Sequence, residues 1–168
     1  YYAIFSCELL ESKTVHPSTE KVGIDVGLEK FATLSNEKTI DNPRHLRKEE
    51  KKLKHYQRLL SRKTKGSKNR IKARHKLALQ HLKIVNQRTD FLHKLSHSLT
   101  QQYHTLVVEN LNIQNMVKNH NLAKSITDAS WNNFIQMLSY KAVTSGGELI
   151  KINPKGTSKE CNQCGKNQ

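Results

Sequence analysis

The feature that most constrains this chain is a long segment that is strongly basic throughout. Between Arg44 and Asp90 the sequence contains 17 lysines and arginines but only 3 acidic residues, a net charge of +14 out of +15 for all 168 residues. A stretch with this charge density cannot form the centre of a core, because isolated charges are costly to bury. We therefore expect one compact unit with a large, solvated basic projection.

The same segment has the residue spacing of two helices. Its first part carries apolar residues at helical intervals: Leu46, Leu53, Tyr56 and Leu60. A polar stretch around Gly66 interrupts the pattern, and apolar residues then recur every seven positions: Ile71, Ala78, Val85, Leu92 and Leu99. Seven-residue spacing is typical of the contact positions of paired helices. Residues 44–102 are therefore predicted to form a helical hairpin with a basic turn.

The charge of this hairpin has two interpretations. A solvated coiled-coil surface is the ordinary one, but such surfaces mix positive and negative residues, and this segment hardly does. Contact with nucleic-acid phosphates accounts for a single sign of charge, and it would supply affinity without sequence preference. The candidate nucleic-acid-binding residues surround the predicted turn: Arg58, Arg62, Lys63, Lys65, Lys68, Arg70, Lys72 and Arg74.

Outside the hairpin, short strands and helices follow one another. Residues 21–35, "KVGIDVGLEKFATLS", alternate apolar and polar positions and predict two strands, with a possible third at residues 39–40. Further strands are predicted within residues 103–113 and 148–153, and a helix between them is expected to start with Asp128 as its N-cap. This order predicts an α/β fold with a mixed sheet.

Two acidic residues occupy unusual places in the predicted strands. Asp25 lies inside an apolar strand, with Gly23 and Gly27 two positions away on either side. It is either an edge-strand residue turned to solvent or a carboxylate that a partner or a cation compensates. Glu109 ends a second apolar strand, and open α/β sheets gather their ligands at such ends. The second acid favours the cation-binding interpretation for both.

The last residues contain half of a zinc site. Cys161 and Cys164 form a CxxC pair followed by Gly165, which is typical of two thiolate ligands on a tight turn, and zinc prefers four ligands. Three histidines could in principle complete the set, but they lack ligand-like spacing: His97, His104 and His120. Cys7 is interpreted as a small apolar residue of a strand.

The same cysteines bear on the cellular compartment. Three cysteines, two of them in CxxC, do not indicate a disulfide framework, and the opening "YYAIFSCELL" lacks the features of a signal peptide. No stretch approaches the roughly 20 apolar residues of a membrane span. We expect a protein of the reducing cytoplasm without a membrane partner, and its oligomeric state is left open.

Six stretches together resemble one protein family. They are "VGIDVGLEKFATLS", "NPRHLRKEEKKLKHYQRLLSRKTKGSKNR", "NQRTDFLHKLS", "LVVENLNIQNMVKN", "WNNFIQMLSYKA" and "PKGTSKECNQCG", in this order along the chain. The chain resembles the TnpB or OrfB family of transposon-encoded, RNA-guided nucleases, which are called transposases in older usage and are relatives of type V CRISPR effectors. An ordered series of stretches is a more specific signal than any single motif.

The resemblance implies a RuvC-like nuclease domain of RNase H type over residues 21–155, with the hairpin of residues 44–102 inserted. Residues 1–20 would end a preceding β-rich domain, and residues 156–168 would begin an incomplete zinc ribbon. Asp25 and Glu109 match the first two acidic positions of the family. They would hold Mg²⁺ or Mn²⁺ for phosphodiester hydrolysis, since hard cations prefer oxygen ligands. The implied partners are a guide RNA and its target DNA.

The sequence departs from the family pattern at its end. The family's second CxxC pair and third catalytic acid have no counterpart before Gln168, so we expect a fragment of a DNA endonuclease that is inactive as it stands. The alternative is a natural remnant or regulator that binds nucleic acid without cleaving it. A basic RNA-binding protein with a zinc ribbon is a weaker third interpretation, because it does not account for Asp25 and Glu109.

Overall fold

The structure, a computed structural model, describes residue 3 and residues 15–154 of the chain. Five strands form one sheet: β1 (Lys21–Val26), β2 (Lys30–Leu34), β3 (Thr39–Asp41), β4 (Thr105–Glu109) and β5 (Glu148–Ile152). Five helices accompany them: α1 (His45–Ser61), α2 (Lys68–Gln102), α3 (Ile113–Met116), α4 (His120–Ala129) and α5 (Trp131–Thr144). The predicted zinc half-site at Cys161 and Cys164, and the predicted first strand with Cys7, lie outside the described residues.

The sheet is mixed, as the sequence predicts. Its strand order is β3-β2-β1-β4-β5, in which β2 is antiparallel to both of its neighbours, β1 and β3, whereas β4 is parallel to both of its neighbours, β1 and β5. The long connection that contains α1 and α2 provides the crossover that the parallel strands β1 and β4 require. Strand β1 is therefore a central strand, so Asp25 is not an edge-strand residue.

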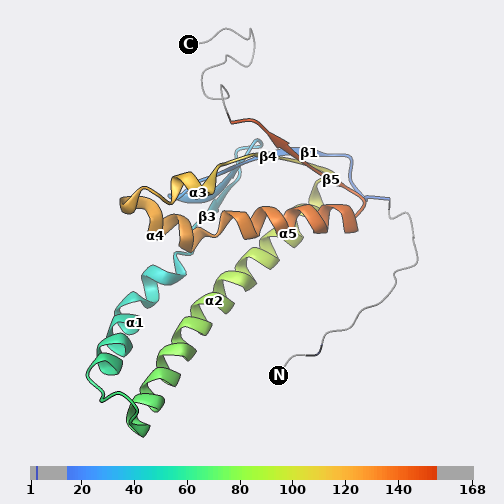
Figure 1. The fold of residues 1–168 in the computed structure, drawn as a ribbon. Helices are drawn as coiled ribbons and strands as arrows, with labels where there is room; N and C mark the ends of the chain where they lie inside the picture. The colour runs from blue at the N-terminus through green and yellow to red at the C-terminus, as the bar shows by residue number, and fades with distance from the viewer. Residues whose placement is uncertain (1–2, 4–14, 155–168) are drawn as a thin grey trace.

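One face of the sheet carries the core. Alternate residues of β1 and β4 point to this face and are buried, among them Ile24, Leu106 and Val108. They pack against α5 and the C-terminal half of α2 through residues such as Phe134 and Leu99. In Figure 1, α5 runs beneath the sheet and α2 leads away from it. The opposite side chains of the same strands, including Asp25, therefore point away from this core.

Helices α1 and α2 form the predicted hairpin, which projects from the core (Figure 1). The turn between them is built by Ser67, which caps α2 through the amide of Arg70, and by Gly66, whose φ of 84° suits glycine. The guanidinium of Arg70 donates to the carbonyls of Leu60 and Lys63, both at 3.1 Å. Arg70 therefore holds the turn together in addition to contributing charge.

The seven-residue pattern in α2 was wrong as a prediction of one continuous contact stripe. Leu92 and Leu99 are buried in the core, but Ile71 and Val85 are 55% and 48% exposed. Toward α1 the helix instead buries Gln80 and Ile84, and the Gln80 side chain donates to Glu49 of α1 at 2.8 Å. The two stripes differ because α2 is continuous from the hairpin into the core and meets different neighbours along its length.

Asp128 does not cap the helix that follows it, which corrects the prediction from sequence. It lies near the end of α4, and α5 begins after Ser130 without a side-chain cap. Its carboxylate instead accepts a hydrogen bond from the Leu46 amide in the first turn of α1 and pairs with Arg88 at 2.8 Å. Asp128 therefore joins α4 to both helices of the hairpin.

None of the helices in the described part of the chain is both long and apolar enough to cross a membrane.

Candidate functional site

Asp25 and Glu109 lie side by side at the ends of two neighbouring parallel strands. Ile24 of β1 pairs with Val108 of β4, so Asp25 and Glu109 are the next residues along the two strands. Because Ile24 and Val108 point into the core, the two acids that follow them point to the opposite face. The two acids therefore lie next to each other on the face of the sheet that is opposite to the core.

The two acids line one shallow hollow of about 330 Å³. Four strands, β1, β2, β4 and β5, contribute to its lining, which is Gly23, Ile24, Asp25, Thr33, Leu34, Ser35, Val107, Glu109 and Ile152. Thr33 is the cross-strand partner of Asp25, and the Ser35 hydroxyl accepts a hydrogen bond from the Gly23 amide at 3.1 Å. Sequence reasoning missed Thr33 and Ser35, although alternation in β2 places both on the face of Asp25.

The environment of Asp25 disfavours its charged form. Partial burial raises the pKa of the Asp25 carboxyl above its ordinary value, and the negative charge of Glu109 raises this pKa further. Such a pair of like charges is stabilised by a cation, and raised carboxyl pKa values are frequent at functional sites. The negative charge of the two carboxylates therefore favours the binding of a cation between them.

The raised pKa predicts a pH-dependent stability effect. A carboxyl that binds its proton more tightly in the folded chain adds stability below its raised pKa, and this contribution is lost as the pH rises through that value. We therefore expect Asp25→Asn to raise the melting temperature at neutral pH, with the gain disappearing in acid, where Asp25 is itself protonated. Thermal unfolding of both proteins across this pH range measures the effect.

Asp41 provides the matched control on the same sheet. Its hydrogen bond with Lys30, and then the charge of Lys30, lower the pKa of the Asp41 carboxyl. The pKa of Asp41 is therefore shifted in the opposite direction from that of Asp25, and Asp41→Asn should not raise the melting temperature at neutral pH. Equal behaviour of the two variants would contradict the electrostatic account of Asp25.

The chemistry of the acid pair fits a hard divalent cation. Two carboxylates on one open face supply oxygen ligands, which Mg²⁺ and Mn²⁺ prefer, with water completing the shell. Within residues 15–154 no cluster of three or more metal-ligating side chains forms. Two carboxylates alone hold a cation weakly, so a metal site built on them would need further ligands.

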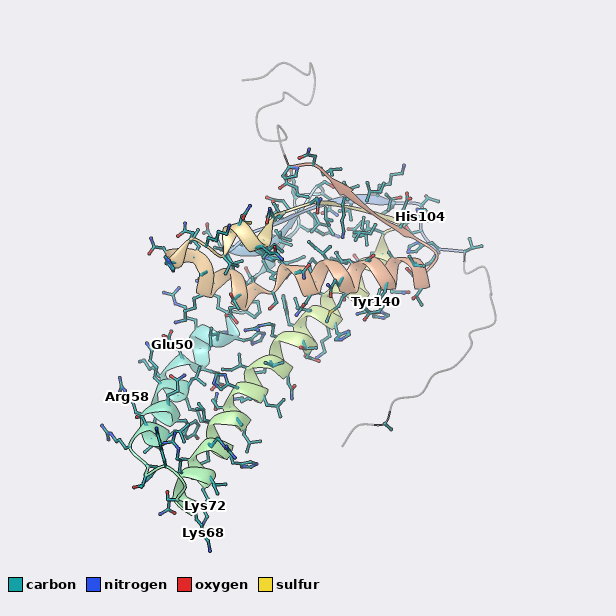
Figure 2. All side chains as sticks on the ribbon, in the orientation of Figure 1. Glu50, Arg58, Lys68, Lys72, His104 and Tyr140 are labelled. Carbon is teal, nitrogen blue, oxygen red and sulfur yellow. The ribbon has the colours of Figure 1, made fainter. Side chains whose placement is uncertain are left out.

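The candidate basic residues gather at the far end of the hairpin. Figure 2 shows Arg58, Lys68 and Lys72 around this end, away from the sheet. All eight are solvent-exposed except Arg70, which is half-buried against the turn. Their charge is unbalanced, because the acids of α1 and α2, which are Glu49, Glu50 and Asp90, pair with lysines farther from the turn. The turn therefore presents a positive surface suited to phosphates.

The chain matches two protein-family models and several curated proteins. The family model OrfB_IS605, described as "Probable transposase", matches residues 4–120, and the model "Cas12f1-like, TNB domain" matches residues 131–168. The chain is similar to "Putative RNA-guided DNA endonuclease" of Streptomyces pristinaespiralis, with 44% identity over 94% of this chain and 40% of the relative. It is 34% identical to "Putative RNA-guided DNA endonuclease InsQ" of Escherichia coli K12, over 98% of this chain and 45% of that protein.

Two further relationships extend the comparison. "TnpB-like protein L79" of Acanthamoeba polyphaga mimivirus is 25% identical over 98% of this chain and 34% of its own length. Among solved structures, a chain of "Cryo-EM structure of the Cas12f1-sgRNA-target DNA complex" shares the fold, with a TM-score of 0.57 at 18% identity over 88% of this chain and 39% of that one. The chain thus spans less than half the length of these curated relatives.

Proposed function

Because the chain belongs to the OrfB_IS605 family, described as probable transposases, we propose that it is the catalytic part of an RNA-guided DNA endonuclease. Curated relatives of the chain are named as putative RNA-guided DNA endonucleases or TnpB-like proteins. The observation that carries the proposal is the position of Asp25 and Glu109 side by side on one face of the sheet, each directly after the paired residues Ile24 and Val108 of β1 and β4. These carboxylates would hold Mg²⁺ or Mn²⁺ at a DNA phosphodiester bond. The mixed sheet and the fold shared with Cas12f1 support a RuvC-like domain of RNase H type.

The acid pair would act by positioning positive charge on an accessible strand. Asp25 and Glu109 sit in a shallow hollow on an open face, so a DNA backbone can approach them. A divalent ion bound there supplies electrostatic stabilisation of the phosphate and activation of water. The raised pKa of Asp25 means that such a site fills more readily as the pH rises and the carboxyl loses its proton. Activity should therefore increase from acid to neutral pH.

The hairpin would bind the sugar–phosphate backbone of the guide RNA and target DNA. A positive surface of exposed lysines and arginines suits the uniform backbone of an RNA–DNA heteroduplex. The Cas12f1 chain that shares this fold was solved with sgRNA and target DNA, which supports the same partners here. In this proposal the hairpin binds the nucleic-acid backbone, and the acid pair holds the cation that promotes hydrolysis.

We also propose a zinc site that uses Cys161 and Cys164 as two of its four ligands. Both residues lie outside the described residues, within the segment that matches the TNB domain model. A CxxC pair followed by glycine favours thiolate coordination of zinc. Zinc binding would then be structural, separate from the carboxylate pair.

A second function is favoured for the 168-residue chain by itself. Within residues 15–154 the acid pair has no third metal-ligating neighbour, so the chain alone is expected to bind nucleic acid and to cleave it poorly. This outcome corresponds to a non-catalytic nucleic-acid-binding protein or regulator. Cleavage by a protein of the relatives' full length, but not by this chain, would agree with nuclease function in the longer protein and with nucleic-acid binding alone in this chain.

The salt dependence of binding tests the role of the hairpin. Changing Lys65 and Lys68 together to alanine removes two exposed charges at the turn, so binding to an RNA–DNA heteroduplex should weaken. The slope of log affinity against log salt should become shallower by about 1 to 2, because each lost phosphate contact removes about 0.7 to 0.9. Fluorescence anisotropy at several salt concentrations measures both quantities.

The matched control removes two exposed lysines elsewhere, Lys38 in the turn between β2 and β3 and Lys94 on α2. Both double variants lose the same net charge, so a general charge effect would change them equally. Equal slopes in the two double variants would mean that the hairpin turn is not the binding surface.

A further inference from the structure

A second hollow, of about 400 Å³, adjoins the end of β4 that carries Glu109, and it is lined by four neutral carboxamide residues and two apolar residues. Its walls are Asn110, Leu111, Asn112, Ile113, Gln114 and Asn132. The lining has no charged side chain, in a protein whose net charge is +15. Such a hollow is not a phosphate site, because phosphate binding uses cationic side chains or clustered backbone amides. Its chemistry is that of hydrogen bonding to a neutral, polar ring.

The backbone of this hollow is fixed by its own hydrogen bonds. The Asn110 amide donates to the Ile152 carbonyl of β5 at 2.8 Å, and the Asn112 side chain accepts from the Asn115 amide at 3.1 Å. Among the hydrogen bonds within the described part of the chain, none uses the side-chain amides of Asn110, Gln114 or Asn132. Three carboxamides on a fixed frame are therefore available to a ligand.

The position of the hollow indicates what it would hold. Asn110 directly follows Glu109, so the hollow begins one residue from the acid pair, and Asn132 of α5 closes it. The two hollows share no lining residue, and they adjoin at the end of β4, where Glu109 of the first is followed by Asn110 of the second. A DNA strand with a phosphate at Asp25 and Glu109 would pass this end of β4 to place a neighbouring nucleotide in the second hollow. We propose that the hollow binds an unpaired base of that strand, one step from the phosphate to be cleaved. This inference rests on the proposed nuclease function.

The chemistry of the lining matches a nucleobase. Each carboxamide offers donors and an acceptor, the combination found on base edges, and Asn and Gln pair with bases in two-point contacts. Leu111 and Ile113 supply apolar surface for the faces of the ring. A base inside a duplex is stacked and paired, so only an unpaired or flipped base can enter. The hollow would thus select single-stranded DNA at the point of cleavage.

Binding of strands with and without bases tests this inference on the chain itself. The probes are an oligo-dA strand and a strand of equal length that carries abasic sites throughout, measured by anisotropy without divalent metal. We expect the abasic strand to bind about tenfold more weakly. Gln114→Ala with Asn132→Ala should remove most of this difference. Asn133→Ala, an exposed neighbour on α5 that does not line the hollow, should preserve it.

The outcomes separate this inference from the proposed function. Equal binding of both strands, or a base preference that survives the Gln114 and Asn132 changes, overturns the base site while leaving nuclease function in place. Loss of the preference in the Asn133 variant as well would also overturn it, since the effect would then be general. If neither strand binds at any salt concentration, the proposed nucleic-acid function fails together with the base site.

Discussion

Replacing Asp25 with asparagine is expected to lower metal-dependent DNA cleavage by about a thousandfold or more in a protein that carries this chain at the length of its relatives. The asparagine keeps the shape of the side chain and its place at the end of β1, but it removes the charge that would hold the cation. Single-turnover cleavage of guide-matched DNA in Mg²⁺ measures the loss. Binding of the guide and the target should stay within about twofold, because the hairpin is unchanged.

Glu109→Gln supplies the internal control for this prediction. If both carboxylates hold one cation, either change alone should cost nearly as much as both together, since groups that act as a unit are not additive. Asp41→Asn, on the same sheet but away from the hollow, should leave cleavage unchanged. Full activity in the Asp25 variant, or strictly additive losses, would exclude a shared metal site.

Asp128→Ala is expected to destabilise the folded chain by about 3 to 5 kcal/mol. The Asp128 and Arg88 side chains are 12% and 18% exposed, so the change leaves the Arg88 charge largely buried without its partner. It also removes the acceptor for the Leu46 amide at the start of α1, which is worth about 1 kcal/mol. Urea denaturation of both proteins measures the free energy of unfolding.

The double variant with Arg88→Met separates the charge effect from lost packing. Without the buried charge, Asp128→Ala should cost much less than in the parent chain, because replacing both members of a buried pair is often well tolerated. Asp41→Asn breaks an exposed pair with Lys30 and should cost less than about 1 kcal/mol. A cost below about 1 kcal/mol for Asp128→Ala would mean that the hairpin base is not anchored there.

The strands and the acid pair could be predicted because their signals are local. Apolar residues identify β1 and β4, and the sequence shows an acid near the end of each strand: Asp25 precedes Val26, the last residue of β1, and Glu109 ends β4. Parallel pairing then brings Asp25 and Glu109 together, since the carboxyl ends of neighbouring parallel strands meet at one edge. The hairpin was predictable for the same reason, because Gly66 and helical spacing are properties of one continuous segment.

The misjudged features depend on contacts between distant segments. In α2, apolar residues follow two helical stripes, and periodicity alone does not indicate which stripe α1 covers. Gln80, a polar residue, is buried because Glu49 of α1 accepts its hydrogen bond, which no pattern in α2 predicts. The heptad positions Ile71 and Val85 consequently face solvent within the described part of the chain.

Asp128 illustrates the same limit for helix caps. A cap is predicted from the residues that directly follow it, so the sequence alone predicts that Asp128 caps the helix that begins near it. Its actual partner, the Leu46 amide, is 82 residues away. Carboxylates favour helix N-termini, and Asp128 lies at the N-terminus of α1 instead of α5. Likewise, the amide-lined hollow combines the loop after β4 with Asn132 of α5, which only the folded chain brings together.

The most direct test of the central claim is a Mn²⁺ titration of the isotope-labelled chain followed by NMR. Paramagnetic Mn²⁺ broadens the amide signals nearest to its binding site. If Asp25 and Glu109 hold the cation, the signals of Val26 and Asn110 should broaden first, and Asp25→Asn should abolish this early broadening. Broadening that starts elsewhere, or that persists unchanged in the Asp25→Asn chain, would contradict a metal site at the ends of β1 and β4.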